Sequence, residues 1–468
     1  MKEDMQRIIS FSKRRGFIYP SSEIYGGLAN AYDYGPLGVE LMANIKELWW
    51  KTFVRSKPDI VGLDTSILMS PRVWEASGHT KSFADVMVDC RECQLRTRAD
   101  HLIEDYLSSA KKEEKVEGKS TQELSEIISS HKIPCPNCGK HNWTEARMFN
   151  QLFETRIGIL PESQSLAYLR GEIAQGMFVN FKNVTDSFRV INPNLEYGLP
   201  FGIAQSGKAF RNEITKGQLT FRTLEFNLAE IEYFFNPQVT DWRELFAFWK
   251  REIEHWTHNI LKISQDHVRW RPQTEDERAH YSTHTEDMDY GFPFGMKETY
   301  ALAYRTDYDL RNHMEKSGQD LRFEDPKTGE KITPHVLEPT FGLDRTLLAL
   351  LSEHYEEGER NILHLPFSLA PFKVAVFPLM GNKPELIEKA REIFGQLSPF
   401  MSVAWDARGN VGKRYYAQDE IGTPLCVTVD YTTLEDGTVT VRNRDTAEQV
   451  RVHAANLRQT IDHMSLSL

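Results

Sequence analysis

Two neighbouring segments decide the fold: AFRNEITKGQ (Ala209–Gln218) and FRTLEF (Phe221–Phe226). They read as two strands joined by a short polar loop, and each strand carries an arginine and a glutamate. Side chains two positions apart in a strand point to the same face, so Arg211 and Glu213 are expected to lie together.

The second strand repeats the pattern, because Arg222, Phe226 and Glu230 share one parity. A sheet face that presents guanidinium groups, an aromatic ring and carboxylates makes a poor core, but it suits an anionic ligand that carries a ring. The pattern therefore favours a nucleotide bound on an antiparallel sheet. Strands with solvated charges and a salt bridge would give the same pattern, so this alternative stays open.

The composition describes a large globular chain. Its 468 residues predict two or three domains, and 40% hydrophobic with 26% charged residues is typical of a soluble protein with an ample core. No stretch approaches the ~20 apolar residues of a membrane span. The start, Met1-Lys2-Glu3-Asp4, lacks the layout of a secretion signal, so we expect a cytoplasmic protein that contacts no membrane.

The net charge of −11 argues against a protein that coats nucleic acid, but it leaves room for local basic patches. Arg408, Lys413 and Arg414 form one such patch, followed by Tyr415 and Tyr416. Basic residues beside aromatic rings suit phosphate contact and base stacking. An ordinary solvated loop is the alternative reading of this patch.

Two C-x-x-C pairs form a second signal: Cys90 with Cys93, and Cys135 with Cys138. In an intracellular chain such pairs favour a four-thiolate structural zinc site over disulfides. The spacer between them is longer than in a usual zinc ribbon, so the site is expected to hold together an insertion rather than a free finger. Two unligated thiol pairs are the alternative. Cys426 stands apart, in an apolar run that reads as a buried strand.

The hydrophobic pattern divides the rest of the chain. Leu37–Phe53 and Asp241–Ile263 are aromatic-rich helical patterns, whereas residues 146–235 read as strands and loops. Within the cysteine-bounded segment, Lys111–Ser120 is nearly all charged and reads as a solvated helix or a mobile link. Beyond Leu365-Pro366-Phe367, strands and helices alternate over the last ~100 residues, which suggests a separate α/β domain.

These residues carry a family resemblance. The arginine-bearing segments resemble the second signature motif of class II aminoacyl-tRNA synthetases, and Gly342-Leu343-Asp344-Arg345 at a helix start resembles the third. Four further segments resemble the homodimeric glycyl-tRNA synthetase family: YDYGPLG (Tyr32–Gly38), WEASGH (Trp74–His79), RADHL (Arg98–Leu102) and QDEIGTP (Gln418–Pro424). The matches span residues 10 to 450, nearly the whole chain.

The resemblance implies an α+β fold: a six- to seven-stranded class II antiparallel sheet flanked by helices, then a C-terminal α/β anticodon-binding domain. The expected domains are residues 1–87 with 146–365 for catalysis, 88–145 for the cysteine-bounded insertion, and 366–468 for the anticodon. The first signature motif is the vaguest, and its dimer-interface proline is Pro58 or Pro71. The implied activity joins glycine to tRNA(Gly) through glycyl-adenylate, with ATP as substrate, Mg²⁺ as cofactor and a homodimer as the assembly.

The resemblance also assigns residues to ATP. Arg211, Glu298 and Arg345 are the expected catalytic residues. Arg211 would hold the α-phosphate and the incoming carboxylate, Glu213 would accept from the adenine amino group, and Phe226 would lie under the ring. Arg345 would lie on the other face of the adenine or at the γ-phosphate, and Glu298 would hold ATP or its Mg²⁺. The full ATP set adds Asn212, Phe221, Arg222, Thr223, Leu224, Glu225, Lys297, Gly342, Leu343 and Asp344.

For glycine, the resemblance places ammonium-binding carboxylates at Glu172, Glu230 and Glu338. Arg98 is the candidate for the substrate carboxylate, and Phe226 and Thr340 complete the set. Thr340 stands where the family usually has a serine. Gly171 replaces a usual proline, which is expected to loosen the loop that carries Glu172, and the bulk of Tyr300 is expected to reshape the pocket floor.

Two other functions remain as alternatives. One is a class II synthetase for another small amino acid, which amino-acid-dependent pyrophosphate exchange would distinguish. The other is a non-catalytic paralogue that binds nucleic acid or serves as a polymerase accessory subunit. A binding module does not need Arg211, Glu213, Arg222, Glu298 and Arg345 together, and this argues against the second alternative.

Overall fold

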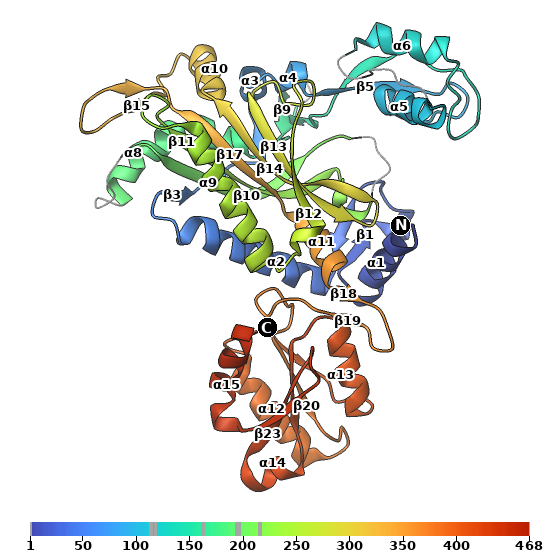
Figure 1. Cartoon of the computed structure of the whole chain (residues 1–468), viewed down its shortest axis with the longest axis vertical. Coiled ribbons are helices and arrows are strands. Elements are labelled where there is room, and N and C mark those ends of the chain that lie inside the picture. The colour runs from blue at the N-terminus through green and yellow to red at the C-terminus, as the bar shows by residue number, and fades with distance from the viewer. Residues whose placement is uncertain are drawn as a thin grey trace.

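The computed structural model describes residues 2–111, 116, 119–160, 164–191, 198–213 and 218–467. Most of the charged segment Lys111–Ser120, and residues 214–217 of the loop between the two motif strands, lie outside the described residues. Figure 1 shows a large sheet with its helices above a smaller C-terminal sheet, and a peripheral segment with helices α5 (Ala99–Ser109) and α6 (Thr121–Ser130) at one upper corner.

A seven-stranded sheet forms the centre of the molecule. Every pair of neighbouring strands is antiparallel except the edge pair β3–β10, which is parallel. The strands, in spatial order, are β12 (Val268–Pro272), β13 (His284–Phe292), β14 (Gly295–Thr306), β17 (His335–Gly342), β11 (Glu225–Phe235), β10 (Phe201–Phe210) and β3 (Ile60–Gly62). The expected antiparallel sheet flanked by helices is confirmed.

Three helices cover one face of this sheet: α2 (Pro36–Trp50), α9 (Trp242–Glu254) and α11 (Leu343–His354). Pro36 occupies the first turn of α2, and the Asp241 side chain caps α9 by accepting from the Arg243 amide. Both aromatic-rich helical patterns are confirmed, and each helix continues into a short π-helical turn, Lys51–Arg55 and His255–Ile260.

The side chains of strand β11 point alternately to the two faces of the sheet, toward the core on one face and toward the candidate site on the other. Its odd-numbered residues Ala229, Ile231, Tyr233 and Phe235 pack into the helix-covered core. Its even-numbered residues, among them Phe226, Glu230 and Glu232, therefore point to the opposite face. The pleat alone thus brings the aromatic ring and the carboxylates of this strand to one side.

The opposite face carries helices that the sequence pattern did not reveal. These are α7 (Ala174–Val179), α8 (Phe181–Ile191) and α10 (Tyr308–Ser317). The expectation of only strands and loops over residues 146–235 is wrong at 174–191. Helix α7 has six residues, too few to show a helical period, and it is buried against Phe201, Phe234 and Phe323.

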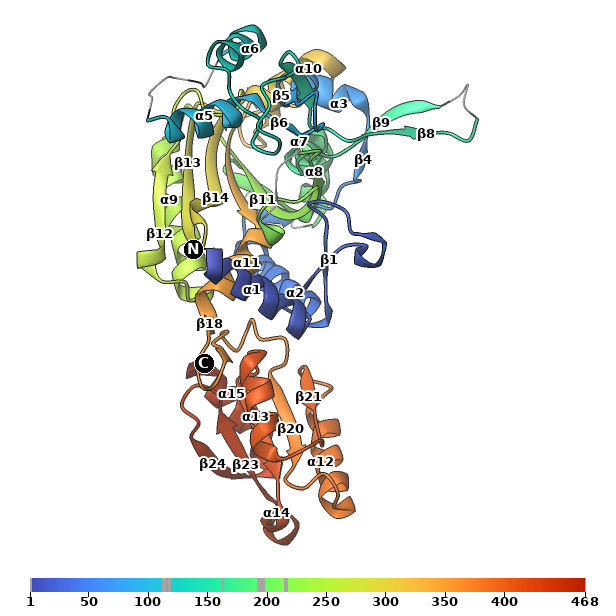
Figure 2. The same cartoon turned by 90° about the vertical axis from the view of Figure 1, so that its right-hand side faces the viewer.

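The cysteine-bounded segment, together with the strands that lead into and out of it, forms a small sheet with its own core. Strands β6 (Arg96–Arg98), β5 (Ala84–Asp89) and β7 (Arg147–Asn150) form the sheet, and α5 and α6 pack their apolar sides together. Nearby, β4 (Leu68–Met69), β9 (Ser165–Leu169) and β8 (Glu154–Ile157) form another three-stranded sheet. Its β8–β9 hairpin projects far from the body of the molecule (Figure 2).

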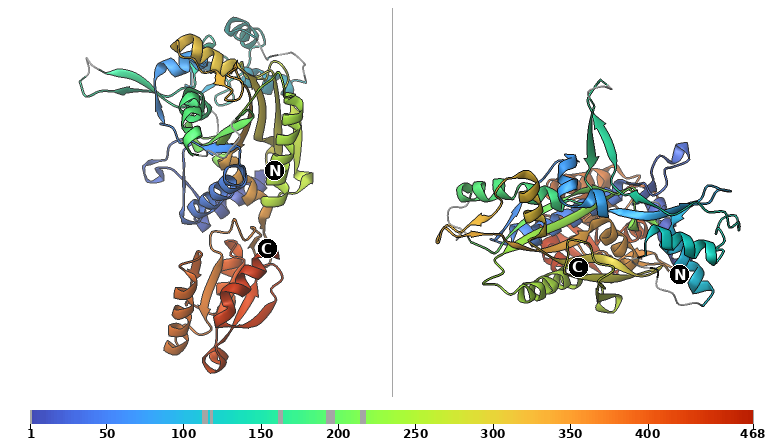
Figure 3. Two further views of the ribbon diagram at one scale, coloured as in Figure 1. Left: turned by 90° about the vertical axis from the view of Figure 1, so that its left-hand side faces the viewer. Right: turned by 90° about the horizontal axis from the view of Figure 1, so that it is seen from above.

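The C-terminal part forms a five-stranded mixed sheet at the opposite end from α6 (Figure 3). Its strand order is β21 (Val403–Trp405), β20 (Val374–Pro378), β22 (Leu425–Val429), β23 (Thr438–Asn443) and β24 (Gln449–His453). Its longer helices are α12 (Pro384–Leu397), α13 (Val411–Glu420) and α15 (Leu457–Met464). The expected α/β alternation is present, and Cys426 is buried in β22 as expected.

The shorter elements connect these parts. The helices are α1 (Lys2–Arg15), α3 (Pro71–Ala76), α4 (His79–Ser82) and α14 (Tyr431–Asp436). The strands are β1 (Ile18–Pro20), β2 (Tyr32–Tyr34), β15 (Phe323–Glu324), β16 (Lys331–Ile332), β18 (Tyr355–Glu356) and β19 (Ile362–Leu363). In the part of the chain that the structure describes, no helix combines the length and the apolar character that crossing a bilayer requires.

Candidate active site

A pocket opens on the even-numbered face of β11, where β10, β11, β14 and β17 lie side by side. Its lining contains most of the expected ATP residues and three of the expected glycine residues, of which Phe226 belongs to both sets. These are Arg211, Glu213, Phe221, Arg222, Thr223, Phe226, Glu298, Gly342, Asp344 and Arg345, with Glu230 and Thr340. Residues far apart in the sequence therefore meet as the two signature motifs predicted.

The polar residues of the second motif lie in the loop, not in the strands. Strand β10 ends at Phe210 and β11 begins at Glu225, so the parity argument for Arg211, Glu213 and Arg222 was wrong. The loop backbone holds Arg211 instead: its amide donates to Leu224 O at 2.9 Å, and its Nε donates to Gly171 O at 3.1 Å.

Two rings flank the Arg211 guanidinium. Its Cζ lies 5.1 Å from the centroid of Phe83 and 5.2 Å from that of Phe226, within cation–π range. Glu213 pairs with Arg222, whose Nε lies 3.1 Å from Glu213 Oε2. The loop thus presents one guanidinium that is held in place and one that is neutralised by a neighbouring carboxylate.

Three other predicted ATP residues support the loop without lining the pocket. The Asn212 amide donates to Gln151 O at 2.8 Å, and the Leu224 amide donates to Asn30 O at 2.9 Å. Glu225 is exposed and pairs with Lys208 at 2.6 Å, on the ladder between β10 and β11. These contacts fix where the loop enters and leaves the sheet.

Arg345 closes the far side of the pocket. Its Nη1 donates to Glu298 O at 2.9 Å and lies 3.2 Å from Glu298 Oε1. Its Cζ lies 4.6 Å from the centroid of Phe221, so in this structure Arg345 stacks on Phe221. Placement of adenine between Phe226 and Arg345 stays a prediction. Lys297, next to Glu298, is exposed in an adjoining cleft.

Asp344 connects the third motif to the second. Its carboxylate accepts from the Asn227 amide at 2.7 Å, from Asn227 Nδ2 at 2.9 Å and from the Tyr34 hydroxyl. Burial raises the pKa of Asp344, although these hydrogen bonds oppose the shift. With Leu343 fully buried behind it, Asp344 sets the position of the α11 start against β11.

The three predicted glycine carboxylates are all buried, and one arginine joins two of them. Arg305 Nη1 donates to Glu338 Oε1 at 2.6 Å, and Arg305 Nη2 lies 3.5 Å from Glu172 Oε1. Arg305 also makes a two-pronged contact with Asp309, at 2.8 and 3.0 Å. Our sequence interpretation missed Arg305 and Asp309. Arg305 lies in β14 and Asp309 in α10, so no local repeat links the two in the sequence, and only the fold brings Glu172 and Glu338 to Arg305.

The Glu172 carboxylate is the most strongly held of the three. It lies 3.1 Å from His79 Nε2, and it accepts from Gln175 Nε2 at 2.8 Å. Ser77 Oγ lies 2.8 Å from His79 Nδ1 and orients the ring. Burial would raise the pKa of Glu172, but His79 and Arg305 hold it well below the usual range. Glu172 is therefore a fixed negative charge at the base of the site.

Glu338 differs from Glu172. Burial, with Glu172 and Asp309 nearby, raises the pKa of Glu338 to about 7 in spite of its contact with Arg305. Glu230 lies beside it on β11, and Thr340 on β17 is its ladder partner. Of this group, Glu230 and Thr340 line the pocket, whereas Glu172 and Glu338 lie behind it.

Arg98 lies outside the pocket, in the adjoining cleft that runs from the cysteine-bounded segment to Arg345. Its Nη1 pairs with Asp85 at 2.8 Å and its Nη2 pairs with Asp100 at 2.6 Å. Two acidic partners already occupy its guanidinium, so its role at a substrate carboxylate stays a prediction.

The structure shows how Gly171 and Tyr300, the two departures from the family pattern, are accommodated. The loop at Gly171 is held on both sides, because Arg170 donates to Lys208 O and Thr65 O at 2.6 Å and Ile173 is fully buried. A Cβ on Gly171 would approach Leu152 Cδ2 to 2.9 Å, so glycine fits this packing.

The expectation for Tyr300 was wrong. Its ring lies in the helix-covered core, 5.2 Å from Phe341, with its hydroxyl 3.0 Å from Thr346 Oγ1. Thr299 lines the pocket at this point instead. The strand pleat explains the error, since neighbouring residues of β14 face opposite sides.

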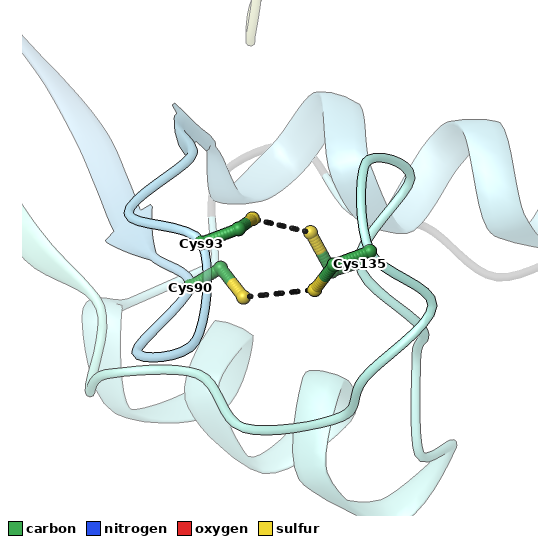
Figure 4. A group of neighbouring side chains, drawn as sticks. Cys90, Cys93 and Cys135 are labelled. Carbon is green, nitrogen blue, oxygen red and sulfur yellow. Dashed lines mark hydrogen bonds between the residues drawn. The ribbon is translucent and has the colours of Figure 1, made fainter.

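The four cysteines come together at the edge of the small insertion sheet (Figure 4). The Sγ atoms of Cys90 and Cys138, and those of Cys93 and Cys135, are 3.6 Å apart, and all four thiols are free. This separation exceeds a disulfide bond and approaches the ~3.8 Å edge of a tetrahedron with ~2.3 Å zinc–sulfur bonds. The donor set and its geometry fit zinc.

One residue of the C-terminal basic patch is not available to a ligand. Arg414 is 2% exposed, and its guanidinium donates to the backbone carbonyls of Pro378, Leu379 and Gly409. Its expected contact with phosphate is therefore wrong, because the side chain holds the end of β20 to α13. Arg408 is fully accessible and Lys413 is exposed, so these two stay candidates.

The antiparallel sheet, the arginine-bearing loop between two of its strands and the arginine at the start of α11 define a class II aminoacyl-tRNA synthetase. Residues 373–464 match the anticodon binding domain family. The chain is 47% identical to the glycine–tRNA ligase of Caldanaerobacter subterraneus subsp. tengcongensis over 97% of its length and 96% of that protein. The chain belongs to the glycine–tRNA ligase family.

Two further relatives cover both chains almost completely. The glycine–tRNA ligase of Geobacillus thermodenitrificans is 47% identical over 99% of this chain and 98% of its own. That of Clostridium perfringens is 48% identical over 99% of this chain and 98% of its own.

Proposed function

We propose that this chain attaches glycine to tRNA(Gly) in two steps. Glycine and ATP first give glycyl-adenylate and pyrophosphate, and the glycyl group then passes to the 3′ end of the tRNA. The observation that carries the proposal is that one pocket combines basic side chains, which suit phosphates, with an acidic side chain, which suits an ammonium group. Arg211 and Arg345 bring guanidinium groups to the pocket, and Glu230 brings a buried carboxyl group.

The first step builds negative charge on the α-phosphate oxygens as the glycine carboxylate attacks. Fixed positive charge and positioning lower such a barrier more than proton transfer does. Arg211 suits this role because its guanidinium can contact two oxygens and is already held by Gly171 O and two rings.

Other residues that line the pocket would make the remaining contacts with ATP. Glu213 would accept from the adenine amino group, with Phe226 under the ring, and Arg345 would meet the ring or the γ-phosphate. Glu298 reaches the pocket with its carboxylate partly exposed, which fits the oxygen ligands that Mg²⁺ prefers. Bound there, the ion would supply positive charge at the phosphates.

Glycine offers only an ammonium and a carboxylate to recognise. Glu230 faces the pocket and would receive the ammonium, with Glu172 and Glu338 adding negative charge behind it and the Thr340 hydroxyl beside it. Larger amino acids would meet the β11 and β17 surface at their β-carbon, and steric rejection of this kind needs no editing site.

Amino-acid-dependent pyrophosphate exchange tests the assignment. With ATP and labelled pyrophosphate, we expect glycine to support exchange at least ~100-fold better, by kcat/KM, than alanine, serine or threonine, because each of these would bring a β-carbon against the surface of β11 and β17. Faster exchange with alanine or serine would show that the amino acid is another one.

We also propose the domain division and the assembly. Residues 1–87 and 146–365 would form the catalytic domain, 88–145 the insertion and 366–468 the anticodon-binding domain, which the family match over 373–464 supports. The protein would act as a homodimer. Arg408 and Lys413 would contact the anticodon stem, because both are exposed in the C-terminal domain.

We further propose that the four cysteines bind a structural zinc ion. Elemental analysis of the purified protein should find about one zinc per chain. Cys135→Ser should lose the metal, because it removes one of four thiolates. Cys426→Ser is the matched control and should keep the metal, because Cys426 lies in another sheet. A metal-free wild-type protein that retains full activity would contradict the proposal.

A further inference from the structure

Glu232 is a buried carboxylate without a role in the proposed reaction. It lies on β11, two residues beyond Glu230, and points to the same face. The residue is fully buried, and neither carboxylate oxygen receives a hydrogen bond from the residues that the structure describes. It does not line the pocket. An ionised carboxylate in such a place needs a reason, because burial without a partner disfavours the charge.

Glu232 belongs to a compact group of three carboxylates. One oxygen each of Glu230, Glu232 and Glu338 lies within 4.8 Å of the others. A second orphan is Oε2 of Glu230, which also lacks a hydrogen-bond donor among the described residues. Like charges this close, in a medium of low dielectric, cannot all ionise without compensation.

The surroundings supply too little compensation. The titratable and charged groups around the trio are Arg305, Asp309, Glu172, His79, His313, Tyr281 and Arg211. Arg305 divides its hydrogen bonds between Glu338 and Asp309 and also faces Glu172, and His79 pairs with Glu172. Neither Arg305 nor His79 donates to Glu230 or Glu232.

The electrostatic directions agree with the geometry. Burial raises the pKa of Glu230 and of Glu232 well above the usual range, and Glu338 raises both further. For Glu338 itself the pKa is about 7, again through burial first. The three carboxylates therefore hold a proton near neutral pH when no substrate cation is bound beside them.

We propose that Glu232 holds a proton in the substrate-free enzyme, shared with Glu230 and Glu338, and that the ammonium group of an amino acid bound beside Glu230 replaces this proton, which leaves to solvent. The proposal rests on the proposed glycine site and adds a positioning residue to it. Glu232 acts through its neighbours: it sets how much negative charge Glu230 presents, and the ammonium supplies the positive charge that ionisation of the trio requires.

This linkage predicts the direction of the pH dependence. If binding releases a proton, glycine binds more tightly as pH rises through the range where the free trio loses its proton. For one released proton, KM for glycine should fall up to about tenfold per pH unit between about pH 6 and pH 8. Once the free trio has lost the shared proton, KM should no longer depend on pH through this linkage.

Pyrophosphate exchange over this pH range, at saturating ATP, provides the test. We expect Glu232→Gln to flatten the KM profile, because removing one acid lets Glu230 and Glu338 ionise before glycine binds, while kcat retains the wild-type pH dependence. Glu315→Gln, on the exposed side of α10, is the matched control and should keep the wild-type slope. A merely structural role for Glu232 would lower activity equally at every pH.

Calorimetry of wild-type protein titrated with glycine, in two buffers of different ionisation enthalpy near pH 7, counts the protons directly and needs no variant. Release of a substantial fraction of a proton per glycine would support the proposal. Glycine binding without release, or the same KM slope in Glu232→Gln as in wild type, would overturn it. Absence of any glycine-dependent exchange would instead overturn the proposed function and this proposal with it.

Discussion

Replacing Arg211 by alanine is expected to lower the rate of glycyl-adenylate formation by about 10²–10³-fold, the usual cost of removing one fixed donor from a developing oxyanion. The guanidinium is held by Gly171 O and by the rings of Phe83 and Phe226, so it is already in position before ATP binds. Single-turnover formation of the adenylate measures the effect. Binding of tRNA, measured separately, should weaken only slightly.

Arg243→Ala is the matched control for this experiment. Arg243 lies on α9 with its side chain 70% exposed, away from the pocket, so the same change of residue type should leave adenylate formation unaltered. Wild-type adenylate formation by Arg211→Ala would contradict the proposed role.

Arg305→Met is expected to destabilise the folded chain by about 3–5 kcal/mol at neutral pH, because it leaves buried carboxylates without their cation. The side chain is fully buried and contacts Glu338, Asp309 and Glu172. Methionine keeps much of the side-chain volume, so the loss of stability would come mainly from the missing positive charge and less from a cavity. Urea unfolding, compared with wild type, measures it.

The pH dependence of this loss has a definite sign. Burial already raises the pKa of Glu338 to about 7 while Arg305 opposes the shift, so without Arg305 the folded state binds more protons at Glu338 than the unfolded chain does. The free energy of unfolding of the variant then falls as pH rises. The deficit relative to wild type should be larger at about pH 8 than at about pH 5.

Arg311→Met is the control for the stability experiment. Arg311 lies in the same helix, α10, and pairs with Asp307 at 3.4 Å, but its side chain is 60% exposed. An exposed pair of this kind contributes at most about 1 kcal/mol. Equal losses for Arg305→Met and Arg311→Met, at both pH values, would show that the buried network is not charge-compensated by Arg305.

The sequence predicted those parts of the fold that rest on periodicity. The aromatic repeats of α2 and α9 are long enough to show a helical period, and the apolar runs of β20 and β22 are bounded by clear turns. Helix α7 escaped prediction, because its six residues are fixed by packing against the sheet rather than by a repeat.

The pocket was predicted by residue type more reliably than by geometry. Phe226 and Glu230 lie on one strand face as expected, because both belong to β11. Arg211 and Arg222 do not, because the strands stop before them and loop hydrogen bonds decide their direction. Arg305 was missed because nothing local distinguishes a buried arginine from a solvated one. Only the sheet brings Glu172 and Glu338 to it.

The alternation along β11 constrains how this site can change. The odd-numbered residues from Ala229 to Phe235 fill the helix-covered core, whereas Phe226, Leu228 and Glu230 line the pocket, so residues of the two sets alternate along the strand. A deletion or insertion of one residue within the strand would turn Ile231 and Tyr233 toward the substrate and drive Glu230 and Glu232 into the core. Substitutions can therefore retune the pocket, whereas a change of length in this strand would destroy the pocket and the core together.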